Sequence, residues 1–161
     1  MLWFMCAAYS SLPVRLAPVF APTLMLIYSA IDILGSLQSK KGFANKKSFT
    51  DWTKNYLIKA KTFQCDENDL YGARCGILHT MRYDSNNTVL KEIVYGFYGY
   101  DKDIKNIKVP TKQVGIYIED LWDAFITAYE IYIQHLESSS NPVVNANLDK
   151  LPNYEDLIPL D

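Results

Sequence analysis

Arg74 and His79 are the two residues of this 161-residue chain whose types and spacing best suit acid–base chemistry. They lie five positions apart in the stretch LYGARCGILHT. Histidine titrates near neutral pH and can move a proton, whereas arginine carries a permanent planar charge that fits phosphate oxygens. Together they suit RNA cleavage without a metal. Histidine would move the proton of a 2′-hydroxyl or a leaving oxygen, and arginine would stabilise charge developing at the phosphate.

A structural interpretation of this pair is also open. Arg74 would then pair with an acid at the start of its own helix, Asp66, Glu67 or Asp69, and His79 would be favoured near the helix end. Five residues are about 140° apart on an α-helix, so the pair does not share one stripe, although a long arginine can curl towards the histidine. Two such helices meeting across a two-fold axis could pool four groups in one cleft.

Asp32 and His135 are two further polar candidates. Asp32 lies within the apolar stretch YSAIDILGSL, where it either hydrogen-bonds inside the core or orients Arg74 or His79. His135 lies near the end of the last long helix, and we expect it to be structural or on the surface.

No other catalytic or cofactor motif is present. The chain lacks a P-loop, a dinucleotide fingerprint, a CxxC pair and HExxH, and no serine or cysteine lies in a nucleophile motif. Two histidines without a matched carboxylate cluster do not suggest zinc, so no cofactor is expected. Cys6, Cys65 and Cys75 have neither metal-ligand spacing nor the even count of a disulfide framework, which favours a reducing, cytoplasmic setting.

Charge is unevenly distributed along the chain, although the net charge is only −2. Seven lysines and one acid lie between residues 40 and 61, whereas nine acids and one lysine lie between residues 119 and 161. These runs are either two solvated faces or, on the basic side, a rim for a phosphate backbone. The candidates for RNA binding are Lys40, Lys41, Lys46 and Lys47.

The apolar pattern predicts the helices that would position these residues. Apolar residues recur at helical spacing, and a short apolar helix ended by Pro13 precedes the long ones. Pro22 suits a first turn, and Ser48 with Asp51 resembles a capping box. The long helices are predicted at 22–38, 48–60, 67–82 and 118–137.

Between the third and fourth long helices the composition changes. TVLKEIVYGFYGY and NIKVPTKQVGIYI are rich in β-branched and aromatic residues, and we interpret them as a small β-hairpin or two short strands. Sequential helices with short connections favour a bundle. The predicted fold is therefore mainly α, a bundle of four to five helices with a small β-hairpin insertion before the last long helix. We expect one domain over residues 1–137 and a polar, acidic tail over 138–161.

A membrane role is the weaker alternative. Residues 16–31 carry no charge, but the run is too short to span a bilayer and contains two prolines. Neither a basic cluster nor a cleavage site marks a signal peptide. We expect burial in a core and no membrane contact, with a membrane-surface or scaffold protein as the remaining possibility.

LYGARCGILHT resembles the signature of the HEPN superfamily, an arginine followed after four to six residues by a histidine on a late helix of a helical bundle. The YSAIDILGSL and IYIEDLWDAFITAYE helices are similar to those of bacterial HEPN-like proteins, so the likeness covers roughly residues 20–137. The resemblance implies a homodimer whose motifs face each other. Many members are metal-independent ribonucleases of toxin–antitoxin, phage-defence or RNA-processing systems. It further implies that Arg74 binds phosphate and that His79 is the acid–base residue.

Cys75 departs from the pattern of the family, since active members often carry Asn, Asp or His directly after the arginine. We include it with Asp32 and Thr80 as supporting residues. Two functions stay open, and with them the question whether the protein is an enzyme. One is a metal-independent endoribonuclease, in toxin–antitoxin or phage defence. The other is a non-catalytic dimer module that binds RNA, a nucleotide or a protein partner such as an antitoxin.

Overall fold

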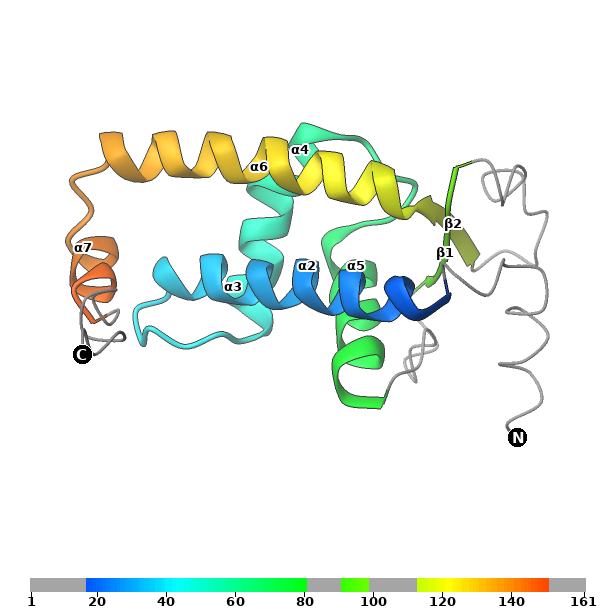
Figure 1. Cartoon of the computed structure of the whole chain (residues 1–161). Coiled ribbons are helices and arrows are strands. Elements are labelled where there is room, and N and C mark those ends of the chain that lie inside the picture. The colour runs from blue at the N-terminus through cyan, green and yellow to red at the C-terminus, as the bar shows by residue number, and fades with distance from the viewer. Residues whose placement is uncertain (1–16, 81–90, 99–112, 151–161) are drawn as a thin grey trace, which may run out of the picture.

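The computed structural model describes residues 17–80, 91–98 and 113–150, which form helices and a small sheet (Figure 1). Two of the helices continue into π-helical segments, labelled η1 and η2. The elements in chain order are α2 (Ala17–Leu37), α3 (Lys46–Trp52), η1 (Thr53–Leu57), α4 (Ile58–Ala60), α5 (Glu67–Cys75), η2 (Gly76–Thr80), β1 (Glu92–Gly96), β2 (Gln113–Tyr117), α6 (Ile118–Ser138) and α7 (Pro142–Leu148). The mainly helical fold is confirmed. The short helix expected before Pro13 lies outside the described residues.

Helices α2 and α6 form the long sides of the molecule and run in the same direction (Figure 1). The Tyr132 hydroxyl of α6 donates a hydrogen bond to the Leu34 carbonyl of α2, with an O–O distance of 2.9 Å. Helix α6 has almost the predicted bounds. Helix α2 begins at Ala17, five residues before the predicted start, so Pro22 lies inside it and removes one backbone hydrogen bond.

Helix α3 crosses α2 at a glycine. A Cβ atom on Gly35 would lie 2.6 Å from the carbonyl oxygen of Ser48, so only glycine allows the two backbones to come this close. The predicted capping by Ser48 was wrong. Asn45 is the N-cap and accepts from the Ser48 amide at 3.1 Å, while the Ser48 hydroxyl accepts from the Asn45 amide at 2.9 Å. The box therefore lies three residues earlier in the sequence, and Asp51 pairs with Lys47 instead.

The two strands lie before the last long helix, as predicted, but they are not a hairpin. β1 and β2 pair in parallel, from Glu92 opposite Gln113 to Gly96 opposite Tyr117. A hairpin joins antiparallel strands, whereas parallel strands need a crossover of a dozen or more residues. Residues 97–112 supply that length. β2 then leads directly into α6.

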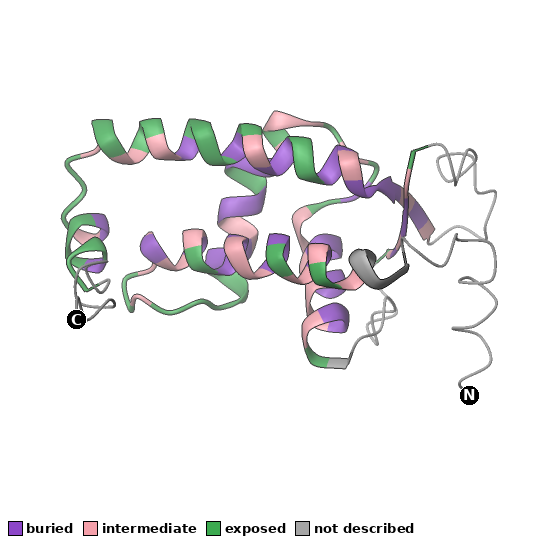
Figure 2. Ribbon diagram, viewed as in Figure 1, coloured by how far each residue is buried: buried purple, intermediate pink, exposed green. Residues whose placement is uncertain are grey.

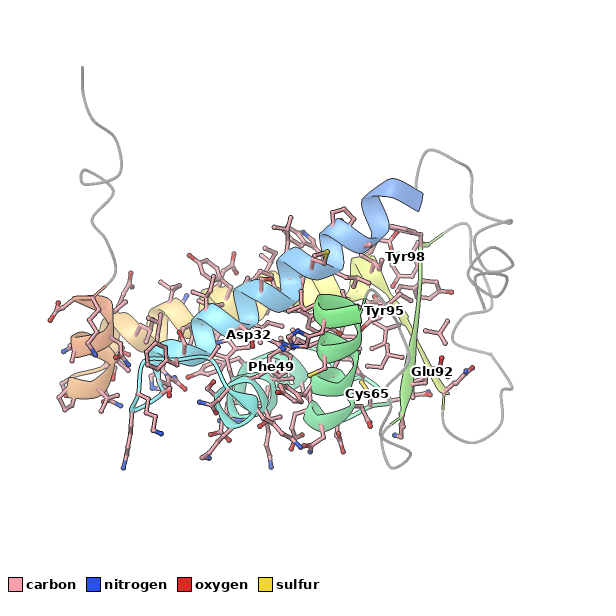
Figure 3. All side chains as sticks on the ribbon, turned by 90° about the horizontal axis from the view of Figure 1, so that it is seen from below. Asp32, Phe49, Cys65, Glu92, Tyr95 and Tyr98 are labelled. Atoms are coloured by element: carbon pink, nitrogen blue, oxygen red, sulfur yellow. The ribbon has the colours of Figure 1, made fainter. Side chains whose placement is uncertain are left out.

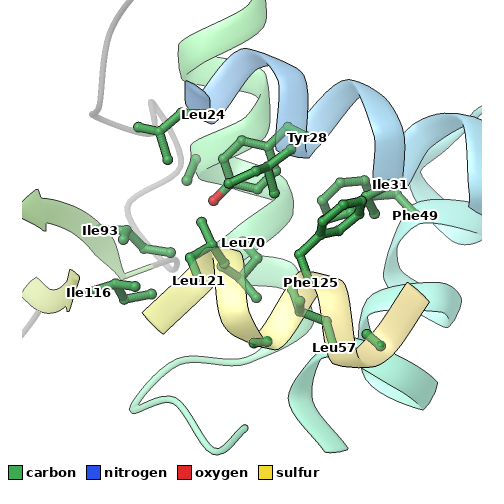
Figure 4. Packing of buried hydrophobic residues seen from close by; sticks show 14 of the residues in the cluster. Leu24, Tyr28, Ile31, Phe49, Leu57, Leu70, Ile93, Ile116, Leu121 and Phe125 are labelled. Carbon is green, nitrogen blue, oxygen red and sulfur yellow. The ribbon is translucent and has the colours of Figure 1, made fainter. Parts of the chain in front are cut away.

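The core lies where the helices meet each other and the sheet. Figure 4 shows Tyr28 and Ile31 of α2, Leu70 of α5 and Leu121 and Phe125 of α6 entering one cluster. Figure 2 shows buried residues where helices meet and exposed residues on the outer side of α6. Aromatic rings dominate the largest fully buried side chains, among them Trp52, Tyr28, Tyr132 and Phe49.

Part of the expected tail is a docked helix. Asn147 of α7 is buried, and its Nδ2 donates to the carbonyls of Leu37 at 3.0 Å and Ser39 at 2.9 Å. Leu37 ends α2, where the helix itself offers its carbonyl no partner, and Ser39 follows in the turn, where its carbonyl also accepts from the Gly42 amide at 2.9 Å. Gly42, with φ of 69°, brings the connecting loop close to the same asparagine. The polar composition that suggested a tail thus includes a buried capping residue. Residues 151–161 lie outside the described part.

Candidate functional site

The start of α5 is fixed by a reciprocal cap. The Asp66 side chain accepts from the amides of Asn68 at 2.8 Å and Asp69 at 2.9 Å. The buried Asp69 carboxylate accepts in turn from the amides of Asp66 at 3.0 Å and Lys91 at 2.8 Å, which ties α5 to β1. Both carboxylates therefore bind backbone amides, and neither is the partner of Arg74.

Arg74 reaches across to α2 and pairs with Asp32. Its Nε and Nη2 atoms donate to the same carboxylate oxygen, Oδ2, at 2.8 and 2.5 Å. The two side chains are only 16% and 12% exposed. Burial lowers the pKa of the guanidinium, but the hydrogen bonds and charge of Asp32 outweigh burial, and the pKa is raised above its ordinary value. Figure 3 shows Asp32 on α2 beside helix α5. Asp32 was expected either to hydrogen-bond inside the core or to orient Arg74 or His79. In the structure its carboxylate binds Arg74.

The remaining terminal nitrogen of Arg74, Nη1, lies 3.0 Å from Nε2 of His79. A guanidinium only donates hydrogen bonds, so Nε2 must accept. The imidazole is then neutral, with its proton on Nδ1. His79 is exposed, whereas Arg74 is mostly covered. The arrangement is a buried aspartate that holds an arginine, which in turn donates to a histidine open to solvent.

The contact between Arg74 and His79 depends on a change of helix type. The α5 helix continues as η2, a π-helix from Gly76 to Thr80. A π-helix bonds each residue to the fifth one before it, and such segments are frequent at functional sites. Two residues five positions apart are therefore separated by a smaller angle about the axis of a π-helix than the 140° that separates them in an α-helix. This departure, which the spacing alone did not predict, brings the two side chains together.

Tyr71 is a residue of this site that the sequence did not single out. The Cζ of Arg74 and the Nζ of Lys46 each lie 5.8 Å from the centre of its ring. The ring also packs edge-on against buried Phe49, with centroids 5.5 Å apart. Burial, with a hydrogen bond to Cys75, raises the pKa of Tyr71. The available signal was its place three residues before Arg74, since such residues are neighbours on a helix.

Cys75 and Thr80 are the other two supporting residues. The Cys75 sulfur lies 3.9 Å from Nη1 of Arg74, so the residue at the unusual position does touch the arginine. Thr80 is the last residue of η2.

Among the contacts within the described residues, one of the four candidate lysines reaches a residue of the site. Lys46, the first residue of α3, reaches Tyr71. Lys47 pairs with Asp51 at 2.7 Å on its own helix. Lys40 and Lys41 are exposed in the loop between α2 and α3.

His135 belongs to a separate contact. Its Nδ1 lies 2.6 Å from the hydroxyl of Tyr56, which also accepts from Nε2 of Gln38 at 3.2 Å. The side chain is exposed, and the bond fixes the end of α6 to η1. The expectation of a structural or surface histidine agrees with this position.

A second polar cluster, which shares no residue with the Asp32–Arg74–His79 network, lies at the start of α6. Buried Asp120 accepts from the Lys61 ammonium and from the Tyr98 hydroxyl. That hydrogen bond, with a smaller effect of burial, raises the pKa of Tyr98 to about 12.

Two absences in the described part of the chain bear on ligands and membranes. No group of three or more His, Cys, Asp and Glu side chains in residues 17–80, 91–98 and 113–150 is placed to hold a metal ion. Among the same residues, no helix has the length and apolar character needed to cross a bilayer.

No family model, curated protein or solved structure matches this chain. The fold and the site therefore define its class on their own. It is a mainly α-helical protein with a two-stranded parallel sheet and a partly buried Asp32–Arg74–His79 network.

Proposed function

We propose that this chain is a HEPN-like, metal-independent endoribonuclease that acts as a homodimer, with Arg74 and His79 of two subunits in one cleft. The observation that carries the proposal is the network itself. Asp32 holds Arg74 so that Nη1 meets Nε2 of His79 at 3.0 Å, at the exposed end of the network. A phosphate placed there would contact a cation and a proton acceptor together.

The proposed reaction begins with the neutral imidazole of His79. Its Nε2 takes the proton of an RNA 2′-hydroxyl, and the freed oxygen attacks the neighbouring phosphorus. Arg74 moves its Nη1 donor from Nε2 to a phosphate oxygen and stabilises the added charge. The bond from phosphorus to the 5′-oxygen then breaks. The products are a 2′,3′-cyclic phosphate and a 5′-hydroxyl.

The leaving 5′-oxygen needs a proton, and one His79 cannot be both the base and the acid in the same step. A second His79, from the partner subunit, meets this need if it starts protonated. The requirement for two histidines in one cleft is the chemical reason for proposing a dimer rather than a monomer. Size-exclusion chromatography with light scattering tests the mass directly.

A cytoplasmic setting in toxin–antitoxin or phage defence would give such an enzyme access to RNA and to an antitoxin. The cysteines support the compartment, since Cys65 and Cys75 are free thiols in the described part of the chain.

A second candidate is a non-catalytic dimer that binds RNA, a nucleotide or a protein. Cys75 favours it, because this thiol occupies a position where active members of the resembled family often carry Asn, Asp or His. The hydrogen bonds of Arg74 favour it as well, since they engage four of the five donors of the guanidinium within the protein.

Cleavage of RNA in excess EDTA separates the two candidates. We expect wild type to cut, and Arg74→Ala and His79→Ala each to abolish cutting while circular dichroism and thermal unfolding show a folded chain. His135→Ala is the matched control, because it removes the other histidine and should leave cleavage intact. A folded, dimeric wild type that leaves a broad panel of RNAs whole would favour the binding module.

A further inference from the structure

We propose that Tyr71 and Lys46 extend the Arg74–His79 site into a second phosphate subsite, so that the site holds two phosphates of one RNA strand. The inference rests on the proposed function, because it concerns the substrate of the same site. It assigns Lys46 a role that the other candidate lysines do not share, and it gives Tyr71 the task of positioning two cations.

The geometry joins two helices that are separate in the sequence. Lys46 opens α3, while Tyr71 and Arg74 lie on one side of α5. Because both cations lie 5.8 Å from the centre of the Tyr71 ring, they lie within about 12 Å of each other. A duplex strand places a phosphate about every 3.4 Å along its axis. A strand that crosses Tyr71 therefore presents more than one phosphate to the two cations.

Charge balance shows why a second cation matters. The charge of Arg74 is neutralised by Asp32, and His79 is neutral when its Nε2 accepts from the arginine. The network alone thus carries no net positive charge, although phosphate binding depends on positive charge. Lys46 is exposed and makes no ion pair within the described residues, so it supplies the net charge of the site.

Tyr71 is well placed to hold this arrangement. Phe49, which is fully buried, packs against the ring edge-on and limits its movement. Cations are attracted to the face of an aromatic ring. The ring therefore favours positions of Lys46 close to Arg74 over the many others that a free lysine side chain can adopt.

Binding of an uncleavable RNA tests the subsite apart from catalysis. The probe is a short, fluorescently labelled single-stranded RNA with 2′-O-methyl groups throughout, which lacks the attacking hydroxyl. Its affinity is measured by anisotropy over a range of salt concentrations. For single strands, each neutralised phosphate contributes about −0.7 to the slope of log affinity against log salt.

We expect Lys46→Gln to weaken binding and to reduce the magnitude of the slope by about 0.7. Lys59→Gln is the matched control, because Lys59 is also exposed and unpaired within the described chain, on α4. It should leave the slope unchanged. Tyr71→Leu should weaken binding while Lys46 is still present, whereas Tyr71→Phe should bind as wild type does, since the ring and not the hydroxyl is used.

Equal slopes for Lys46→Gln and Lys59→Gln would overturn the subsite, as would a wild type that fails to bind the probe. A wild type that binds with the expected slopes but cuts no cleavable RNA would leave the subsite standing and reject the nuclease. Failure of the inference and failure of the proposed function are thus distinguishable.

Discussion

Replacing Asp32 with asparagine removes one charge from the Asp32–Arg74 pair and keeps the shape of the side chain. Removing one partner of a buried ion pair costs about 3–5 kcal/mol, whereas exposed pairs contribute about 0–1 kcal/mol. At 12% and 16% exposure, this pair lies near the buried end of that range. Asparagine still offers a neutral oxygen to the guanidinium, which retains part of the interaction. We therefore expect Asp32→Asn to lower the free energy of unfolding by about 2–3 kcal/mol.

Urea unfolding at pH 7, followed by circular dichroism, measures this loss as a shift of the midpoint at constant m-value. The matched control is Asp51→Asn, which breaks the ion pair between Lys47 and Asp51. Those side chains are 83% and 50% exposed, so the cost should stay within about 0.5 kcal/mol.

A double-mutant cycle with Arg74→Gln then isolates the pair from other effects of each change. Because each single variant already loses the same interaction, the double variant should cost less than the sum of the two by about 2 kcal/mol. Additivity within about 0.5 kcal/mol would refute the ion pair. So would an Asp32→Asn variant as stable as Asp51→Asn.

Three further predictions concern the scaffold. Gly35→Ala should destabilise the protein by about 1–3 kcal/mol in urea unfolding, because its Cβ would lie 2.6 Å from the Ser48 carbonyl oxygen, and a neutral or stabilising effect would contradict this contact. Asn147→Ala should cost about 1–3 kcal/mol by leaving the Leu37 carbonyl without its donor, while the exposed Asn145→Ala should cost far less. Tyr98 should ionise at about 12, measured as the difference between the ultraviolet titrations of wild type and Tyr98→Phe. Because its pKa is raised on folding, its contribution to stability is present below pH 10 and is lost as the pH rises through about 12, and ionisation near 10 would contradict the Asp120 contact.

The main helices could be predicted because their signals are local. Apolar residues at helical spacing defined the end of α2 and nearly all of α6, and Asp66 preceded α5 as a cap. The starts of α2 and α3 were missed for a local reason as well. Proline is tolerated inside the second turn of α2, and Asn45 competes with Ser48 for the capping position.

The long-range features gave no such signal. Asp32 lies 42 positions before Arg74, and no rule of spacing joins residues that meet only when α2 packs beside η2. Tyr71 and Lys46 meet for the same reason, through the contact of α3 with α5.

Strand direction is the second feature that composition leaves open. Parallel and antiparallel strands have the same apolar and β-branched character, so the hairpin was the simpler interpretation. The connection over residues 97–112 was long enough for a crossover, and the pairing of β1 with β2 is parallel. The role of Asn147 was missed for a similar reason. The polar composition of residues 138–161 suggested a tail, whereas the hydrogen bond from Asn147 to the Leu37 carbonyl is decided by packing.

The chemistry of the product ends tests the central claim most directly. A defined RNA is incubated with wild type, Arg74→Ala and His79→Ala in excess EDTA, and the fragments are analysed by mass spectrometry. If the Asp32–Arg74–His79 network directs attack by the 2′-oxygen, wild type yields 2′,3′-cyclic phosphate and 5′-hydroxyl ends, and both variants yield none. Intact RNA with wild type, or the same fragments from the His79→Ala variant, would contradict it.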